Sequence, residues 1–335
     1  MLLLLNSLAH LLVDGLCAAT VFGPVAAAGD ISGLVLLYNT LAFSTQCLVG
    51  LAADRIGRHG PAAAAAMALV VLGFALPVPP WLRICLVGGG NSLFHVAGGV
   101  MVMERSGGKA GPLGVFVAPG AVGLTLGTLW PVLGTAFAIL LGCCAIAVAP
   151  LEKASPREEL PAGRSETGVS LAVPLLLTLA VAVRAVGGTA VTFPWKTGAA
   201  MALVTTLCVF GGKTAGGFLC DRLGAGKTAL VSVVPAAALI AFCSAWAGPS
   251  LAGQLLLNLT MPVTLWLLYR AMPDSPGFAF GLAASALWPG TIAGQLMHLT
   301  GPLLWLCVIV SFVFGLGAIL RAERELTRKG GLLSC

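Results

Sequence analysis

The sequence predicts an all-α integral membrane protein with twelve transmembrane helices arranged as two six-helix repeats. The first observation is composition: 58% of the 335 residues are hydrophobic and 9% are charged, whereas a soluble domain carries about 25% charged residues. The second is a series of charge-free stretches long enough to cross a bilayer, and the third is a loop motif that occurs twice, half a chain apart. This composition excludes a disordered chain, a coiled coil and an ordinary cytosolic enzyme.

The charge-free stretches set the number of spans, because one transmembrane helix needs about 20 apolar residues. Residues 110–151, 228–269 and 275–320 contain no Asp, Glu, Lys or Arg, and each stretch is long enough for two helices. A proline near the middle of each stretch marks a helix start, since proline fits the first turn of a helix but not its interior. The predicted spans are 2–28, 31–53, 61–78, 83–103, 112–130, 131–151, 169–192, 197–219, 227–247, 249–272, 277–299 and 302–321.

These spans divide the chain into four predicted parts. They are an N-terminal six-helix half (1–151), a cytoplasmic linker (152–168), a C-terminal six-helix half (169–321) and a cytoplasmic tail (322–335). The connecting loops are too short for an extramembrane domain. The apolar N-terminus has no basic segment before it and continues past Asp14, so we interpret it as the first span and not as a signal peptide.

The basic residues predict the orientation. An even number of spans places both termini on one side of the membrane. Of the 18 Lys and Arg residues, only Arg83 and Lys196 fall on the opposite side, and Arg184 and Lys213 lie within spans. By the positive-inside rule, both termini are predicted to be cytoplasmic in a multi-pass protein of the cell membrane. The net charge of +6 therefore reflects topology, and we expect no nucleic-acid partner.

A loop motif occurs after the second span and again after the eighth. The first copy consists of Gly50, Asp54, Arg55, Gly57 and Arg58, and the second, 167 residues later, of Gly217, Asp221, Arg222 and Gly224. Matched loops in two six-span halves predict a parallel repeat about an axis along the membrane normal. We expect the first glycine of each copy to let helices approach closely. The Asp–Arg pair is expected to hold a cytoplasmic gating hairpin in one of two arrangements.

This motif resembles the loop signature of the major facilitator superfamily, Gly-x3-Asp-Arg-x-Gly-Arg, and the resemblance covers nearly the whole chain. The second copy has Ala225 in place of the last arginine, so we expect Asp221 to matter less than Asp54. Residues 88–95, residues 106–111 and the glycines of 120–127 are similar to the fosmidomycin-resistance branch of that superfamily. The resemblance implies transport by rocking of two halves, with the first, fourth, seventh and tenth spans around a central cavity.

Polar residues are concentrated in those four spans, where ionisable groups are costly and usually functional. A spacing of four residues places the polar residues of one span on one helix face. Asp14 is the one acidic residue deep in a span, and histidines titrate near neutrality. Arg184 is expected either to hold an anionic substrate group or to neutralise Asp14. The predicted substrate and proton cavity comprises Asn6, His10, Asp14, Asn91, His95, Arg184, Gln254 and Asn258.

The sequence contains no recognisable motif for catalysis or for binding a cofactor. The ten cysteines form no Cys-x2-Cys pair, and two Gly-Lys-Thr stretches lack the earlier glycine of a phosphate loop. We therefore expect no catalytic residue, no metal site and no cofactor, and we expect the chain not to be an enzyme.

These features together predict a secondary active transporter that moves a small molecule by alternating access. Without a nucleotide-binding motif the energy source is an ion gradient, most simply of protons, and the expected partners are protons, the substrate and the lipid bilayer. We expect a monomer that works by proton-coupled export, as an efflux antiporter. The alternatives are proton-coupled uptake of a small polar or anionic nutrient and an integral membrane lipid-modifying enzyme, which needs a nucleophile or metal cluster near the headgroups.

Overall fold

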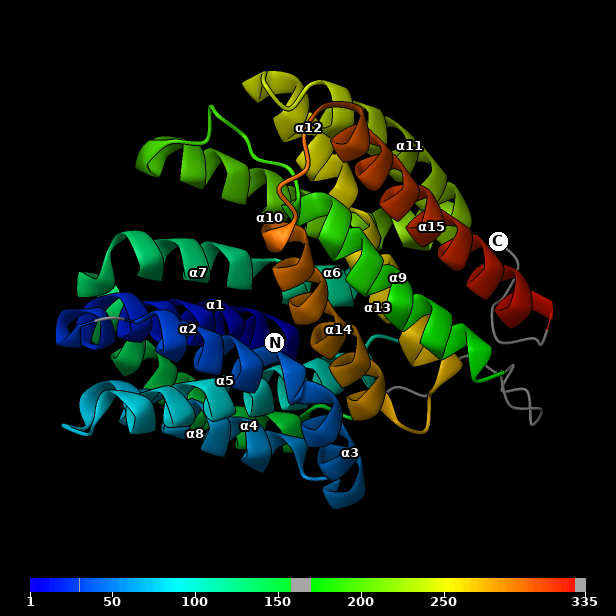
Figure 1. The fold of residues 1–335 in the computed structure, drawn as a ribbon. Helices are drawn as coiled ribbons and strands as arrows, with labels where there is room; N and C mark the ends of the chain where they lie inside the picture. The colour runs from blue at the N-terminus through cyan, green and yellow to red at the C-terminus, as the bar shows by residue number, and fades with distance from the viewer. Residues whose placement is uncertain (30, 158–169, 329–335) are drawn as a thin grey trace. The chain divides into compact units, whose positions relative to one another are not determined.

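The protein was analysed as a computed structural model, which describes residues 1–29, 31–157 and 170–328, and every regular element within these ranges is a helix (Figure 1). The all-α prediction is therefore confirmed. Most of the predicted linker 152–168 and the last residues of the predicted tail 322–335 lie outside the described residues.

The first six predicted spans are all helical, and three of them are interrupted. The first is α1 (Leu2–Thr20) with a π turn and a 3-10 turn up to Ala28, and the second is α2 (Ser32–Asn39), a π turn and α3 (Gln46–Ile56). They are followed by α4 (His59–Ala75), α5 (Pro80–Met103), α6 (Gly111–Val117) with α7 (Pro119–Leu129), and α8 (Gly134–Ala154) after a 3-10 turn. Pro24 lies in the first π turn and Pro119 begins α7, because proline cannot donate the backbone hydrogen bond that a continuous helix needs.

The last six predicted spans are also helical. They are α9 (Ala172–Thr189), α10 (Gly198–Leu223), α11 (Ala225–Phe242), α12 (Ala247–Asn258) with α13 (Thr260–Ala271), α14 (Pro276–Leu296) and α15 (Gly301–Arg328). Ten helical segments of the described chain are long and apolar enough to cross a membrane. The other two are α4, which is a shorter apolar helix, and α14, whose glycines, Pro289 and Gln295 lower its hydropathy.

The described chain packs as two compact units. The first comprises residues 1–105, 115–157 and 275–281, and the second comprises residues 106–114, 170–274 and 282–328. The first unit thus includes the start of α14, and the second includes the start of α6.

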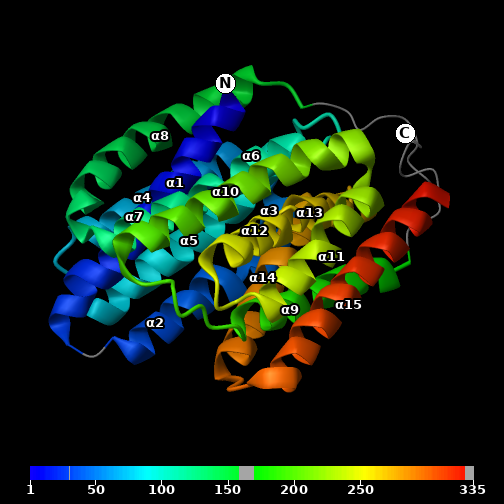
Figure 2. The ribbon, with the colours of Figure 1, turned by 90° about the horizontal axis from the view of Figure 1, so that it is seen from above.

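The same helix pairs occur in both units. In the first, α1 packs against α5, α7 and α8, and α4 packs against α5 and α8. In the second, α9 packs against α13, α14 and α15, and α11 packs against α12 and α15. Figure 2 shows α15 running along α11. The second unit therefore repeats the helix packing of the first, with α12 and α13 together in the place of α5.

Glycines allow the closest of these contacts. A β-carbon on Gly123 would overlap the carbonyl of Leu11, and one on Gly127 would overlap the carbonyl of Gly15. In the second unit, β-carbons on Gly290 and Gly294, each 167 residues later, would overlap carbonyls of α9 in the same way. We call these two contacts the glycine seams. Small residues serve this purpose in membranes because association there depends on close van der Waals packing.

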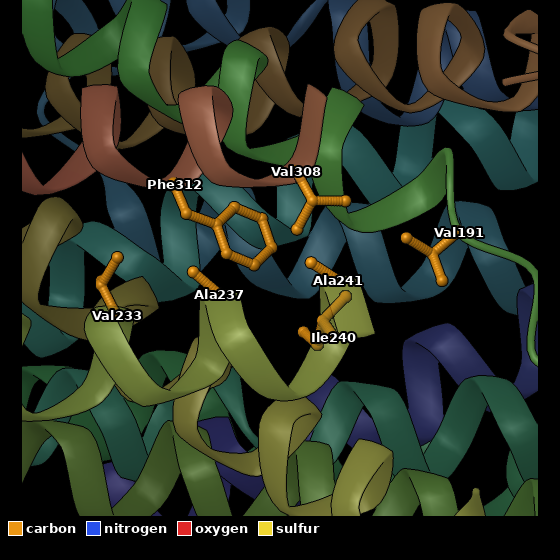
Figure 3. Packing of buried hydrophobic residues seen from close by; sticks show 7 residues of the cluster. All are labelled: Val191, Val233, Ala237, Ile240, Ala241, Val308 and Phe312. Atoms are coloured by element: carbon orange, nitrogen blue, oxygen red, sulfur yellow. The ribbon is translucent and has the colours of Figure 1, made fainter. Parts of the chain in front are cut away.

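One apolar cluster of the second unit lies mainly between α11 and α15. It consists of Val191, Val233, Ala237, Ile240, Ala241, Val308 and Phe312 (Figure 3). The Phe312 ring fills the space that the alanines of α11 leave, so a large side chain faces small ones. This complementarity gives the dense packing that holds helices together in lipid.

Candidate functional site

Four of the predicted cavity residues lie together in the first unit. His10 and Asp14 are on α1, Asn91 and His95 are on α5, and all except Asp14 are buried. The His10 Nε2 atom lies 3.3 Å from Asp14 Oδ2, and the His95 Nε2 atom lies 3.6 Å from Asp14 Oδ1. The Asn91 side-chain amide donates to Asp14 Oδ1 over 2.9 Å. We call His10, Asp14, Asn91 and His95 the intramembrane polar cluster.

Backbone carbonyls orient both imidazole rings of this cluster. The His10 Nδ1 atom lies 2.7 Å from the carbonyl oxygen of Phe116, and the His95 Nδ1 atom lies 2.9 Å from that of Asn91. Since a carbonyl only accepts, each Nδ1 carries the hydrogen, and each Nε2 is turned towards Asp14. The sequence did not predict that the Phe116 carbonyl and Gly120 lie against this cluster, because a backbone carbonyl and a glycine have no functional side-chain group.

The remaining predicted cavity residues do not join this cluster in the same way. Asn6, although fully buried, donates to the carbonyl of Leu2 one turn back in its own helix. Gln254 and Asn258 likewise donate to carbonyls one turn back, within α12. These three side chains donate hydrogen bonds to backbone carbonyls of their own helices, and their assignment to the cavity stays a prediction.

Arg184 lies in the second unit. Its guanidinium donates to the Thr260 hydroxyl, and both residues line a small cavity together with Thr264 and Phe312. Within the described part of this unit, no carboxylate lies within ion-pair distance of Arg184. A half-buried guanidinium that donates to a hydroxyl beside a small cavity can also bind an anionic group.

The two loop motifs place a carboxylate at the start of another helix. Asp54 accepts backbone N–H bonds from Gly277 (2.7 Å) and Phe278 (2.8 Å), at the start of α14 in the first unit. Asp221 accepts N–H bonds from Ala110 (2.7 Å) and Gly111 (2.8 Å), at the start of α6 in the second unit. Residues 277 and 110 are themselves 167 positions apart. These bonds satisfy helix-terminal N–H groups and place negative charge at the positive end of the helix dipole.

The first glycine of each motif makes this arrangement possible. A β-carbon on Gly50 would overlap the backbone of Gly277, and one on Gly217 would overlap the backbone of Ala110. The later glycines end the helices: Gly57 has φ +65° and Gly224 has φ +83°, a region that favours glycine. Arg55 and Arg222 lie in the last turns of α3 and α10, where positive charge is favourable. Arg58 follows as the residue before α4.

A second pair of capping carboxylates was not found from the sequence. Glu152, near the end of α8, accepts the Gly60 N–H over 2.7 Å at the start of α4. Glu323, near the end of α15, accepts the Gly226 N–H over 2.9 Å at the start of α11. The sequence pattern that could have revealed this pair is a glutamate near the end of the last span of each half, together with a glycine near the start of the third span of the same half.

Glu104 forms a charged group at the end of α5. Its carboxylate lies 3.1 Å from Arg157 Nε and 3.6 Å from Arg105 Nη1, and 4.0 Å from His59 Nε2. Burial raises the pKa of the Glu104 carboxyl above its ordinary value of 4.5, and the two arginines oppose this shift only in part. The protonated form is therefore favoured by folding.

This raised pKa predicts a pH-dependent effect of Glu104→Gln. The stability that comes from a protonated Glu104 is fully present below pH 4.5 and is lost as the pH rises through the raised pKa. The glutamine variant imitates the protonated form, so we expect it to unfold at a higher temperature than the wild type at pH 8 and at the same temperature at pH 4. Thermal unfolding in detergent measures this, and a lower unfolding temperature for the variant at pH 8 would contradict it.

Two solved structures share this fold across nearly the whole chain. A crystal structure of the major facilitator superfamily transporter FucP in the outward conformation has a TM-score of 0.73 at 12% sequence identity, and the match covers 96% of this chain and 98% of that one. A variant of the E. coli fucose:proton symporter FucP has a TM-score of 0.68 at 14% identity, with the same coverage. This chain has the fold of a major facilitator transporter.

The likeness to these major facilitator transporters is one of fold. No protein-family model matches the sequence, and no curated protein matches it closely. Both neighbours are transporters, and at 12% and 14% identity their likeness to this chain is one of fold. The likeness to the fosmidomycin-resistance branch stays a prediction.

Proposed function

We propose that this protein is a secondary active transporter that exports a small molecule across the cell membrane by alternating access, driven by a proton gradient. The observation that carries the proposal is the pair of Asp54 and Asp221 caps. Each consists of a carboxylate and two backbone N–H groups, and the two caps are related by the 167-residue repeat.

Alternating access needs contacts that hold one state and break in the other. A carboxylate that accepts two N–H bonds can act as such a contact, because the N–H groups at a helix start lack partners within their own helix. By the positive-inside rule, both caps belong to the cytoplasmic face, and we propose that they break and re-form as the transporter changes state. One neighbour in fold, the major facilitator superfamily transporter FucP, was crystallised in the outward conformation.

The coupling ion of the proposal is the proton, which is also the ion named for the neighbouring fucose:proton symporter. Export is proposed from the resemblance to the fosmidomycin-resistance branch. The second candidate is proton-coupled uptake of an anionic solute. It is favoured by Arg184, whose guanidinium lines a small cavity beside the hydroxyls of Thr260 and Thr264. A monomer suffices for either.

Flux measurements in proteoliposomes test the proposal. The purified chain is reconstituted, and a panel of radiolabelled anionic, neutral and cationic solutes is followed with and without an imposed pH gradient. We expect at least one solute to move against its concentration gradient only when the pH gradient is present. Movement opposite to the proton flow indicates export by antiport, and movement with it indicates the uptake alternative. Proton coupling would be contradicted if the flux of every transported solute were the same with and without the pH gradient.

A further inference from the structure

The intramembrane polar cluster brings three metal-binding side chains together. One ligand atom each from His10, Asp14 and His95 lies within 4.8 Å of the other two. The two imidazole rings meet edge to face, with their centroids 4.4 Å apart. We infer that His10, Asp14 and His95 form a binding site for one divalent transition-metal ion of the Zn²⁺ type. This inference goes beyond the proposed function and does not depend on which solute is transported.

The spacing of the ligand atoms fits such an ion. Zinc binds imidazole nitrogen and carboxylate oxygen at about 2.0–2.1 Å in tetrahedral geometry, which separates neighbouring ligand atoms by about 3.3 Å. The His10 Nε2 and Asp14 Oδ2 atoms lie 3.3 Å apart, and the His95 Nε2 and Asp14 Oδ1 atoms lie 3.6 Å apart. Each imidazole nitrogen therefore lies at about the separation of neighbouring zinc ligands from one oxygen of the Asp14 carboxylate, although the ligands come from two helices.

The hydrogen bonding of the cluster also fits a cation. Both Nδ1 atoms face backbone carbonyls, so in neutral rings both Nε2 atoms carry lone pairs, and these are aimed at a carboxylate that has lone pairs only. A metal ion can accept lone pairs from all three side chains at once, whereas one proton bridges only two.

Each ligand is held by a second group, as metal ligands usually are. The Phe116 carbonyl orients His10, the Asn91 carbonyl orients His95, and the Asn91 side-chain amide holds Asp14 Oδ1. Imidazole and carboxylate together suit zinc and its neighbours in the first transition row better than calcium or magnesium. Three protein ligands leave the fourth position open, which is typical of a site whose ion exchanges.

Gly120 provides the space beside the ligands. A β-carbon there would overlap both Asp14 Oδ2 and His10 Nε2, so the methyl group of Gly120→Ala would enter the site without removing any ligand. This variant separates metal binding from the loss of a ligand's own structural role.

Binding of Zn²⁺ and Co²⁺ to the purified full-length chain in detergent tests the inference. The chain has four histidines, so the variant His59→Gln/His298→Gln retains only the two of the proposed site and is the matched background. We expect this background to bind one Zn²⁺ by calorimetry. We also expect Co²⁺ to give the visible absorption of a tetrahedral nitrogen–oxygen site, without the near-ultraviolet band of a thiolate ligand.

In that background, Asp14→Asn, His95→Gln and Gly120→Ala are each expected to weaken Zn²⁺ binding about 100-fold or more. Without metal, each variant should elute from a sizing column at the same volume as the background. If a ligand variant does not fold, the Zn²⁺ affinity of Gly120→Ala tests the inference. Absence of stoichiometric binding, binding unchanged in Gly120→Ala and His95→Gln, or a thiolate band would each overturn the inference. Since binding is measured without transport, failure here leaves the flux test of the proposed function unaffected.

Discussion

Asp54→Asn is expected to slow solute flux about 10- to 100-fold while the protein still inserts and folds. The amide keeps one acceptor oxygen but turns an NH₂ group towards the second backbone N–H at the start of α14, and it removes the charge from that helix end. Hydrogen bonds to charged groups contribute about 1.5–3 kcal/mol, and each 1.4 kcal/mol changes an equilibrium tenfold. The balance between the two transport states shifts accordingly. Initial flux rates in proteoliposomes, corrected for inserted protein, measure the effect.

Asp221→Asn should have an effect of the same size. Sequence reasoning led us to expect a weaker one, because the second motif has Ala225 in place of the last arginine. The structure gives a reason to revise this expectation, since Asp221 and Asp54 each accept two N–H bonds of equal length. Asp274→Asn is the matched control, because Asp274 is exposed in a loop, and it should transport like the wild type. Wild-type flux in an inserted Asp54→Asn protein would show that this cap has no role in transport.

Alanine substitutions in the glycine seams are expected to have the largest effect on stability. The β-carbon of Gly123→Ala would overlap the Leu11 carbonyl, and that of Gly290→Ala would overlap the Ala182 carbonyl. Backbone atoms cannot rotate away as side chains do, so the helices must separate. Overpacking costs about 1–3 kcal/mol, and we expect each variant to unfold several degrees below the wild type in detergent.

The control for this prediction is Gly142→Ala in α8, where a β-carbon meets nothing within 4 Å. Alanine is favoured over glycine in a helix by about 1 kcal/mol, so this variant should be as stable as the wild type or more stable. Equal unfolding temperatures for Gly123→Ala and Gly142→Ala would mean that the seam adjusts without cost.

Hydropathy along the sequence predicts most of the fold but a smaller part of the candidate site. Charge-free stretches and prolines predicted the twelve helical segments, because a helix must run the thickness of the bilayer. Helix α11 ends five residues before its predicted end and α15 continues seven residues beyond, and the other ends agree within four residues. The interruption before Pro119 was not predicted, although proline limits the preceding turn. Four-residue spacing predicted that His10 and Asp14 share a face and that Asn91 and His95 share another.

Spacing along one helix does not reveal which faces meet. That the faces of α1 and α5 oppose each other depends on packing between residues some 80 positions apart, as does the approach of His95 to Asp14. The sequence therefore showed no metal-binding motif, because the ligands of the proposed site lie on two helices. The N–H partners of Asp54 and Asp221 were missed because backbone groups have no residue type, although the 167-residue offset already related their positions.

The Asp54 cap also sets an order in which the protein can be completed. Asp221 meets N–H groups of residues 110 and 111, which precede it in the chain and are already synthesised when it emerges. Asp54 must wait for residues 277 and 278, more than 220 positions later. During synthesis from the N-terminus, the first unit consequently lacks these two partners of Asp54 until the eleventh span arrives. The half of the protein that is made first is therefore completed only after most of the second half has been made.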